Sequence, residues 1–196
     1  MIAMRLPEPA ELRNLFDELS TAEFTYGEVG ATRRDVPKGY NVDRYSTNLG
    51  RGDIVFESAK RAIREWIPFD MPWIRAFPQA EPRQGVMVAV VARLVGLWWT
   101  NVSRVIYTID EPDRFGFAYG TLPYHAETGE ELFLVERSRE SFEVDYRILA
   151  FSKPRHLLAR LGYPLSRAAQ RRFGAASLDA MRNATSRERA GRKVTL

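Results

Sequence analysis

Cysteine is absent from the 196 residues, and histidine occurs only at positions 125 and 156. Without cysteine the chain has no thiol nucleophile, no thiolate metal ligand and no disulfide framework. No run reaches the ~18 apolar residues of a membrane-spanning helix, because the longest, at residues 86–99, is short and contains Arg93. The first residues hold no apolar stretch of signal-peptide length. We therefore expect a cytoplasmic protein without a membrane span. A chain of this size buries roughly 70% of its unfolded surface, which is enough for folding without a disulfide or a structural metal.

Standard catalytic signatures are lacking as well. The sequence contains no G-x-S-x-G nucleophile elbow, no phosphate-binding P-loop and no H-E-x-x-H zinc motif. One histidine in a turn, with glutamates nearby, is a weak zinc site. We therefore predict no metal and no cofactor, and the sequence alone names no reaction.

Positive charge is concentrated near the C-terminus. Residues 153–196 hold eleven Lys or Arg against Asp179 and Glu188, a net charge of +9. Such a segment suits an acidic partner or an anionic surface, but it also fits a solvated helix face followed by a loosely ordered tail. Because no known nucleic-acid module accompanies the charge, we do not expect nucleic acid as the partner.

Apolar periodicity and turn residues divide the chain into helices and strands. The predicted elements, in order, are a helix at 7–19, a strand at 39–47, a helix at 53–66, a proline-rich loop or lid at 68–83, a strand at 85–95, a turn at 96–99, strands at 101–110, 115–122, 130–137 and 142–151, and C-terminal helices to about residue 184 with a break at 162–164.

This order predicts an α+β protein. Five consecutive strands with short turns form an antiparallel meander, and the C-terminal helix carries the apolar stripe that can cover it. We expect a helix-grip fold, in which a strongly curved sheet wraps around the long C-terminal helix and short helices follow the first strand. The predicted division is an N-terminal helix extension at 1–23, one helix-grip domain at 24–184 and a basic, flexible tail at 185–196.

Several segments together resemble one family. The most specific reads GFAYGTLPYHAETGEELF, at residues 116–133. The others lie at 26–32, 97–101, 104–107 and 150–154. The chain is similar to a widespread bacterial and plant family catalogued only as a domain of unknown function, and it departs from that pattern at Tyr124, where the family has glycine. The resemblance covers roughly residues 24–184 and implies kinship with helix-grip proteins of the lipid-transfer and pollen-allergen type, but no established activity.

The strand at 115–122 has two unlike faces. Phe115, Phe117 and Tyr119 alternate with small residues at 116, 118 and 120. A bare strand face leaves room for a helix or a ligand to approach the backbone. We expect the C-terminal helix, or a ligand beneath it, to occupy that space.

Acid–base candidates cluster in the following turn and strand. His125 lies close to Glu127 and Glu131, and an imidazole with a carboxylate suits general acid–base chemistry near neutral pH. The alternatives for His125 are a cap of the turn through a backbone hydrogen bond, contact with a ligand, or a metal ligand.

A second set of residues is predicted to line a cavity beneath the helix. The ligand-binding candidates are Trp73, Arg93, Trp98, Asn101, Tyr107, Phe117, Tyr119, Phe133 and Phe151. Polar groups on the strands either pair inside this cavity and orient a ligand's polar end, or form cross-strand ion pairs on the outer face. The polar residues considered for an inward position are Arg93, Asn101, Arg104, Tyr107, Tyr119, Glu131, Asp145 and Arg147. The outer-face alternative concerns Arg104, Asp145 and Arg147.

Three function classes follow. The first is a binding protein for a small hydrophobic or amphipathic molecule. The second is a hydrolase, cyclase or hydratase that acts on such a molecule, with His125 and the nearby glutamates as acid and base. The third is an interaction protein that uses its basic C-terminal segment. The sequence predicts no oligomeric state.

Overall fold

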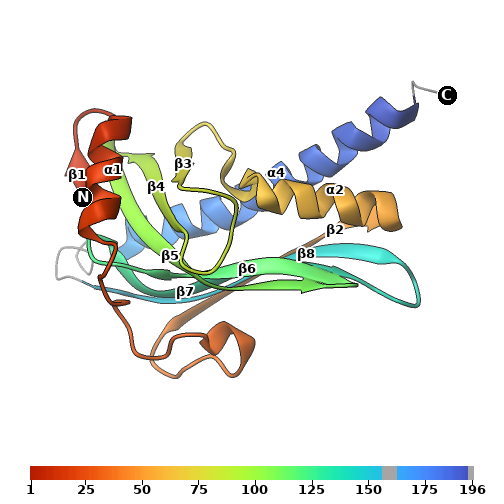
Figure 1. Cartoon of the computed structure of the whole chain (residues 1–196), viewed down its shortest axis with the longest axis horizontal. Helices are drawn as coiled ribbons and strands as arrows, with labels where there is room; N and C mark the ends of the chain where they lie inside the picture. Colours follow the sequence, from red (N-terminus) through yellow and green to blue (C-terminus); the bar gives the residue numbers. More distant parts are fainter. Residues whose placement is uncertain (156–162, 194–196) are drawn as a thin grey trace.

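One antiparallel sheet organises the structure. The structure is a computed structural model that describes residues 1–155 and 163–193. Within these residues, eight strands form a sheet in the order β2-β8-β7-β6-β5-β4-β3, and β1 pairs with β5. Strands β4 to β8 lie beside their neighbours in sequence and are all antiparallel. The predicted meander is therefore confirmed (Figure 1).

The strands are β1 (Ile2–Ala3), β2 (Asn41–Arg51), β3 (Ile74–Pro78), β4 (Met87–Leu94), β5 (Leu97–Glu111), β6 (Arg114–Thr121), β7 (Glu127–Arg137) and β8 (Glu143–Pro154). The helices are α1 (Pro9–Glu18), α2 (Asp53–Arg64) and α4 (Tyr163–Lys193), with short 3-10 turns η1 (Ala31–Arg33) and η2 (Ile67–Phe69). The short helix expected just before the break at 162–164 lies outside the described residues.

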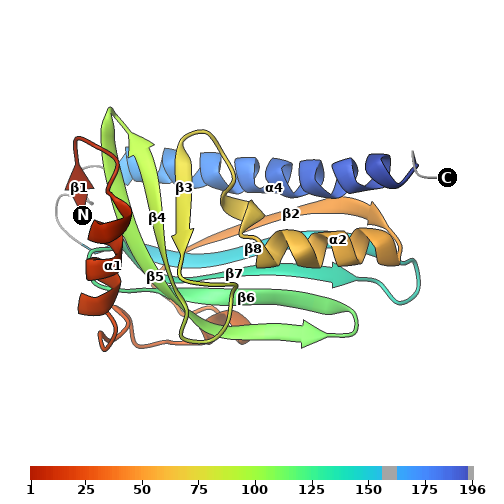
Figure 2. The ribbon, with the colours of Figure 1, turned by 45° about the horizontal axis from the view of Figure 1, so that its top comes forward.

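Helices α2 and α4 lie over the same face of the sheet, which we call the inner face (Figures 1 and 2). Helix α2 packs there because its apolar residues recur at helical spacing and form one buried stripe. That stripe consists of Val55, Phe56, Ala59, Ala62 and Ile63. From α4, Met181 and Ser177 are fully buried. The α+β helix-grip arrangement predicted from the sequence is confirmed.

The opposite, outer face is covered near β4 and β5 by α1. Leu12, Leu15 and Phe16 are buried against Ala89 and Val102. A capping box between Glu8 and Glu11 begins the helix. Its C-terminal carbonyl groups are met by Arg104 of β5, whose guanidinium donates hydrogen bonds to the carbonyl oxygens of residues 19, 20 and 22. Arg104 is therefore neither a cavity residue nor a cross-strand ion pair.

A second segment, residues 24–34, covers the outer face farther along β6 and β7 (Figure 1). The Thr25 hydroxyl lies 2.6 Å from that of Thr121 and 2.9 Å from that of Thr128. The Tyr26 hydroxyl donates to Glu130 of β7 at 2.9 Å. These bonds fasten an otherwise irregular segment to the sheet.

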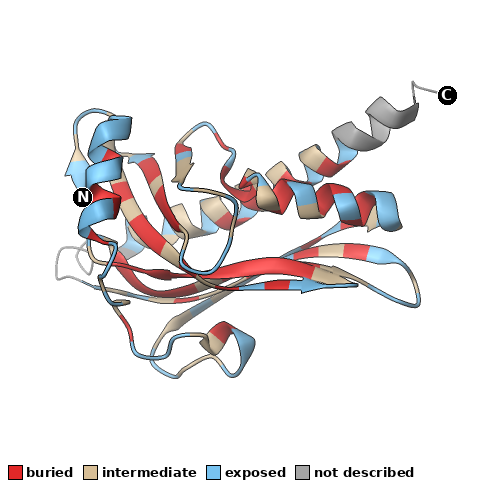
Figure 3. Cartoon of the chain, viewed as in Figure 1, coloured by how far each residue is buried: buried red, intermediate tan, exposed pale blue. Residues whose placement is uncertain are grey.

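Burial follows the two faces of the strands. Strands β6 and β7 are buried along almost their whole length, since both of their faces are covered (Figure 3). The aromatic core lies on the inner face. There the Phe133 ring lies 5.2 Å, between centroids, from both Phe69 and Phe117. Phe173 of α4 reaches Phe69 at 5.5 Å.

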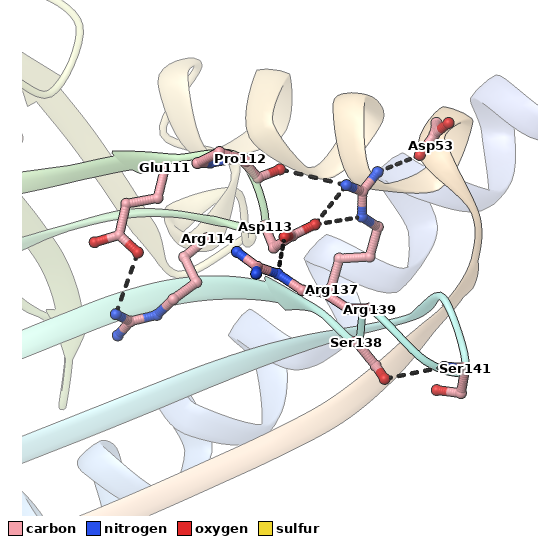
Figure 4. A network of polar contacts seen from close by, with 9 residues as sticks. All are labelled: Asp53, Glu111, Pro112, Asp113, Arg114, Arg137, Ser138, Arg139 and Ser141. Carbon is pink, nitrogen blue, oxygen red and sulfur yellow. Dashed lines mark hydrogen bonds and ion pairs between the residues drawn. The ribbon is translucent and has the colours of Figure 1, made fainter.

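A polar network at the far end of the sheet fixes the start of α2 (Figure 4). Arg137, at the end of β7, donates to Asp113 in the β5–β6 turn through Nε at 3.0 Å, and it also pairs with Asp53 at the first turn of α2. Arg139 bonds the other Asp113 oxygen at 2.7 Å. Hydrogen bonds from the two guanidinium groups lower the pKa of Asp113, which favours its charged form.

Three local expectations need correction. The proline-rich segment 68–83 contains strand β3, because β3 is an edge strand and its one proline, Pro78, stands at its end. Trp98 and Trp99 belong to β5 and not to a turn, since the reversal is made by Val95 and Gly96, which both have positive φ. Residues 185–193, assigned to a loosely ordered tail, continue α4.

The prediction of what covers the small residues of β6 was also wrong. Gly120 faces outward, where a Cβ atom would stand 2.3 Å from the Tyr26 hydroxyl and 2.9 Å from Phe24. The segment at residues 24–26 therefore fills the space that we expected the C-terminal helix or a ligand to fill. The bulky face, with Phe117 and Tyr119, is the one that points toward α2 and α4.

Candidate functional site

A row of side chains crosses four strands of the inner face. Asp43 of β2 is paired with Ala150 of β8, Ala150 with Glu131 of β7, and Glu131 with Tyr119 of β6. The Tyr119 hydroxyl donates a 2.7 Å hydrogen bond to Glu131 Oε2. Two carboxylates thus flank one small alanine side chain on three adjacent strands at the β2 edge of the sheet.

Glu131 is the unusual member of this row. Burial among apolar groups raises its pKa to about 7, and the charges of Asp43 and Glu127 act in the same direction. The Tyr119 hydrogen bond opposes the rise only in part. In the described part of the chain, no donor reaches Oε1 of Glu131. With a pKa of about 7 this carboxyl group takes up or releases a proton near neutral pH, and its Oε1 has no hydrogen-bond donor among the described residues.

The side of the row beneath α4 is closed by polar contacts. Arg167 binds both oxygens of Asp43, at 2.5 and 2.6 Å, in a bidentate pair. Glu127, at the start of β7, accepts hydrogen bonds from Ser152, Ser166 and Gln170. Asp43 and Glu127 thereby fix the first turns of α4 to the sheet, whereas Glu131 takes no part in that attachment.

Next to the polar row lies an aromatic row. Tyr45, Ile148, Phe133 and Phe117 are successive partners across the same four strands. Phe117 and Phe133 are fully buried, while Glu131 and Ala150, one row away, keep partial exposure. A partly exposed carboxyl group therefore lies beside a closed layer of aromatic side chains.

The structure divides the predicted ligand-binding residues between several environments. On the inner side lie Phe117, Tyr119 and Phe133, together with Trp73, which packs at the edge of the same core under the guanidinium of Arg172 of α4. Asn101 is partly buried, and its side-chain oxygen accepts a hydrogen bond from the Ala126 amide, so it holds the β6–β7 turn.

The remaining candidates lie elsewhere. Phe151 packs on the outer face, edge-on to Tyr26 and Tyr40 with centroids 5.8 and 5.1 Å apart. Tyr107 also faces outward, because a bulge between Val105 and Tyr107 reverses the alternation of β5. Arg93 is exposed and lies over the Trp98 ring at 5.7 Å, as its cross-strand partner.

Asp145 and Arg147, which were also considered for an inward position, lie on the outer surface. Arg147 bonds Glu136 of β7 at 3.0 Å and approaches Asp145 at 3.8 Å. These are the cross-strand ion pairs that we weighed as the alternative to an inward position.

His125 stabilises the turn before β7. Its Nδ1 accepts a 3.1 Å hydrogen bond from the Glu127 amide, so the ring is neutral and carries its proton on Nε2. Burial lowers its pKa to about 4, and the chain's amino terminus and Arg155 act in the same direction. Within the described residues, no hydrogen bond joins His125 to a carboxylate. The other histidine, His156, lies outside them.

Sequence reasoning missed the members of the site that come from distant segments. Asp43, Ala150, Arg167 and Gln170 meet only because β2, β8 and α4 come together in the fold. The one available signal was the mixed polar and apolar pattern of the strand at 39–47. Among the residues that the structure describes, no group of three or more His, Asp or Glu side chains is arranged to hold a metal ion. No helix in that part of the chain is long and apolar enough to cross a membrane.

Comparisons of sequence identify one family. Residues 25–180 match the family described as "Domain of unknown function (DUF1990)". A "UPF0548 protein" of Deinococcus radiodurans is 34% identical over 184 residues, which cover 88% of this chain and 92% of that protein. A "UPF0548 protein" of Dictyostelium discoideum is 29% identical over 195 residues, which cover 88% and 90%.

Comparisons of structure identify the fold. The Zhui aromatase/cyclase from Streptomyces sp. R1128 superposes with a TM-score of 0.54 at 14% identity, over 76% of this chain and 94% of that chain. Norcoclaurine synthase from Thalictrum flavum, solved with a transition-state analogue, has a TM-score of 0.54 at 10% identity, over 79% and 99%. Human STARD10 has a TM-score of 0.51 at 10% identity, over 96% and 84%. At these identities the likeness concerns the helix-grip fold alone.

Proposed function

The chain belongs to the DUF1990 family, and for this member we propose that it binds a small, largely apolar molecule between the inner face of the sheet and α4. The ligand's polar end would meet Glu131. One observation carries the proposal. Glu131 lies on the inner face with one oxygen bonded to Tyr119 and a pKa raised to about 7. A carboxyl group held in this way is costly for stability, and such groups concentrate where a ligand is bound or transformed.

The surroundings of Glu131 define the ligand's chemistry. The aromatic rings of Phe117 and Phe133 favour apolar or aromatic surface next to the carboxyl group. Because Glu131 Oε1 accepts no bond from the described residues, it suits a ligand hydroxyl or amine that donates a hydrogen bond. We therefore expect an amphipathic ligand with a single donor at one end.

Proteins of the same fold support the binding of a small molecule, without bearing on its position. The norcoclaurine synthase structure contains a transition-state analogue, and the Zhui protein is described as an aromatase/cyclase, so helix-grip proteins hold and transform small organic molecules.

Ala150 offers the sharpest test of the site. Ala150→Leu would place a larger side chain between Asp43 and Glu131, while Ala175→Leu, on the exposed side of α4, adds the same atoms outside the site. A panel of aromatic alcohols, amines and matched hydrocarbons is screened by thermal shift and native mass spectrometry. We expect the wild type and Ala175→Leu to bind the same members, and Ala150→Leu to bind them at least tenfold more weakly.

Two results would contradict the proposal. One is the absence of any bound member at millimolar concentration. The other is equal binding by the wild type and by a folded Ala150→Leu variant, since that would place the ligand away from the row.

A second candidate function is catalysis on the bound molecule. A group with a pKa of about 7 is suited to give and take a proton at neutral pH. We assign the acid–base role in a hydratase, cyclase or hydrolase reaction to Glu131, because His125 Nδ1 and both Glu127 oxygens already accept hydrogen bonds. Once a ligand is found, mass spectrometry should show turnover by the wild type, and Glu131→Gln should bind without turnover. Unchanged turnover by Glu131→Gln would exclude this assignment.

A further inference from the structure

A pocket of about 300 Å³ opens on the outer face, on the side of the sheet opposite the site of Glu131. Its walls are the segment at residues 30–34, the middle of β5 and Gln84 from the loop before β4. Two of the seven lining residues, Arg33 and Arg34, are cationic, and none is acidic. A positively charged pocket of this size fits a small anion or the anionic end of a small molecule.

Arg33 is held in position before any ligand arrives. Its guanidinium lies 3.7 Å from the centroid of the Tyr107 ring, and Nη2 donates a 3.0 Å hydrogen bond to the carbonyl oxygen of Thr108. A guanidinium stacked on an aromatic ring loses little freedom when it binds an anion. Among the residues that the structure describes, no carboxylate forms an ion pair with this guanidinium, so its charge remains available to an anion.

The segment that carries the two arginines is itself fastened to the sheet. Glu130 of β7 accepts hydrogen bonds from the Gly30 amide at 2.7 Å and from the Thr32 amide at 2.9 Å, and it also binds the Thr32 hydroxyl. The Thr32 hydroxyl lies 2.6 Å from that of Tyr107. Residues 30–34 therefore form a rigid wall of the pocket.

We propose that this pocket binds the phosphate group of a small phosphorylated molecule. The side chains of Arg33 and Arg34 supply two positive charges, which match a phosphate dianion, and the Gln84 amide adds a neutral donor. Glu130 contacts the same segment from the sheet side, and its negative charge offsets part of the positive charge of the two arginines. The proposal is independent of the ligand of the inner face, because different residues on opposite faces form the two sites.

Titration with inorganic pyrophosphate, followed by calorimetry and by amide chemical shifts, tests this inference. For the wild type we expect saturable binding, with shift changes concentrated at residues 30–34, 84 and 106–108. The double variant Arg33→Gln/Arg34→Gln should bind at least tenfold more weakly. The control Arg13→Gln/Arg51→Gln removes the same charge from exposed positions outside the pocket and should bind like the wild type.

A conservative variant and a second anion make the test more specific. Arg33→Lys keeps the charge but loses the planar fork, so we expect affinity between those of the wild type and the double variant. Malonate should bind more weakly than pyrophosphate. The proposal is overturned by the absence of saturable binding at 10 mM pyrophosphate, by shift changes outside the pocket, by tighter binding of malonate, or by equal loss in both double variants. Because the shift map uses the wild type alone, it decides the question even where a variant does not fold.

Discussion

Glu130 and Glu131 are consecutive residues of β7, and they occupy opposite faces of the sheet. Glu130 points outward and accepts hydrogen bonds from Tyr26, Gly30 and Thr32, which fill both of its oxygens. Glu131 points inward and has one hydrogen-bond partner among the described residues, the Tyr119 hydroxyl. The same side chain thus serves in one case to hold a segment of chain and in the other to present an open acceptor. Saturation with donors, and not burial alone, separates a structural carboxylate from a candidate functional one.

The largest effect is expected from removing the outward carboxylate. Glu130→Ala would leave the amides of Gly30 and Thr32 and the Tyr26 hydroxyl without their acceptor. Each buried group that loses its partner costs about 1–3 kcal/mol, so the free energy of unfolding should fall by at least about 3 kcal/mol. Urea denaturation measures it. A loss below about 1 kcal/mol would show that Glu130 does not hold the segment.

The segment that Glu130 fastens can also be displaced from the sheet side. Gly120→Ala would place a methyl group 2.3 Å from the Tyr26 hydroxyl, and we expect a loss of about 1–3 kcal/mol in unfolding free energy. Gly27→Ala is the matched control, because its Cβ would meet no atom within 4 Å. Equal stabilities of the two variants would mean that residues 24–26 do not cover Gly120.

The inward carboxylate should behave in the opposite way. Its pKa is about 7 in the folded protein and 4.5 for the free side chain, so the folded state binds more protons between these values. The stabilising contribution of the protonated form is complete below pH 4.5 and is lost as the pH rises through 7. Glu131→Gln has no such loss, so relative to the wild type it should gain roughly 2 kcal/mol between pH 5 and pH 8.5. Urea denaturation at the two pH values checks this, and a variant whose relative stability does not change with pH would refute it.

Much of the fold followed from the sequence. The apolar stripe of α2 and the five strands of the meander are set by local periodicity, which the sequence displays directly. The edge strand β3 escaped notice because prolines surround it. The continuation of α4 through residues 185–193 was missed because polar, charged residues there show no apolar stripe.

The site was less predictable, for a geometric reason. The alternation of side chains along a strand divides its residues between two faces but does not say which face is the inner one. A single β-bulge exchanges the two faces for all residues that follow it. The bulge after Val105 moved Tyr107 to the outer face, and nothing in the sequence marks it. Phe151 likewise has the size of a cavity residue but packs outward on Tyr26 and Tyr40. Tyr119 and Glu131 were both candidates, and the fold made them direct cross-strand partners.

The protonation of Glu131 itself is the most direct test of the contrast between the two carboxylates. Titration of the side-chain carboxyl ¹³C resonances of Glu131 should give a midpoint near pH 7. In Tyr119→Phe, which removes the hydrogen bond that lowers this pKa, the midpoint should move higher. A midpoint near 4.5 in the wild type, unchanged in Tyr119→Phe, would show that Glu131 is an ordinary solvated glutamate and would contradict its place at the centre of the site.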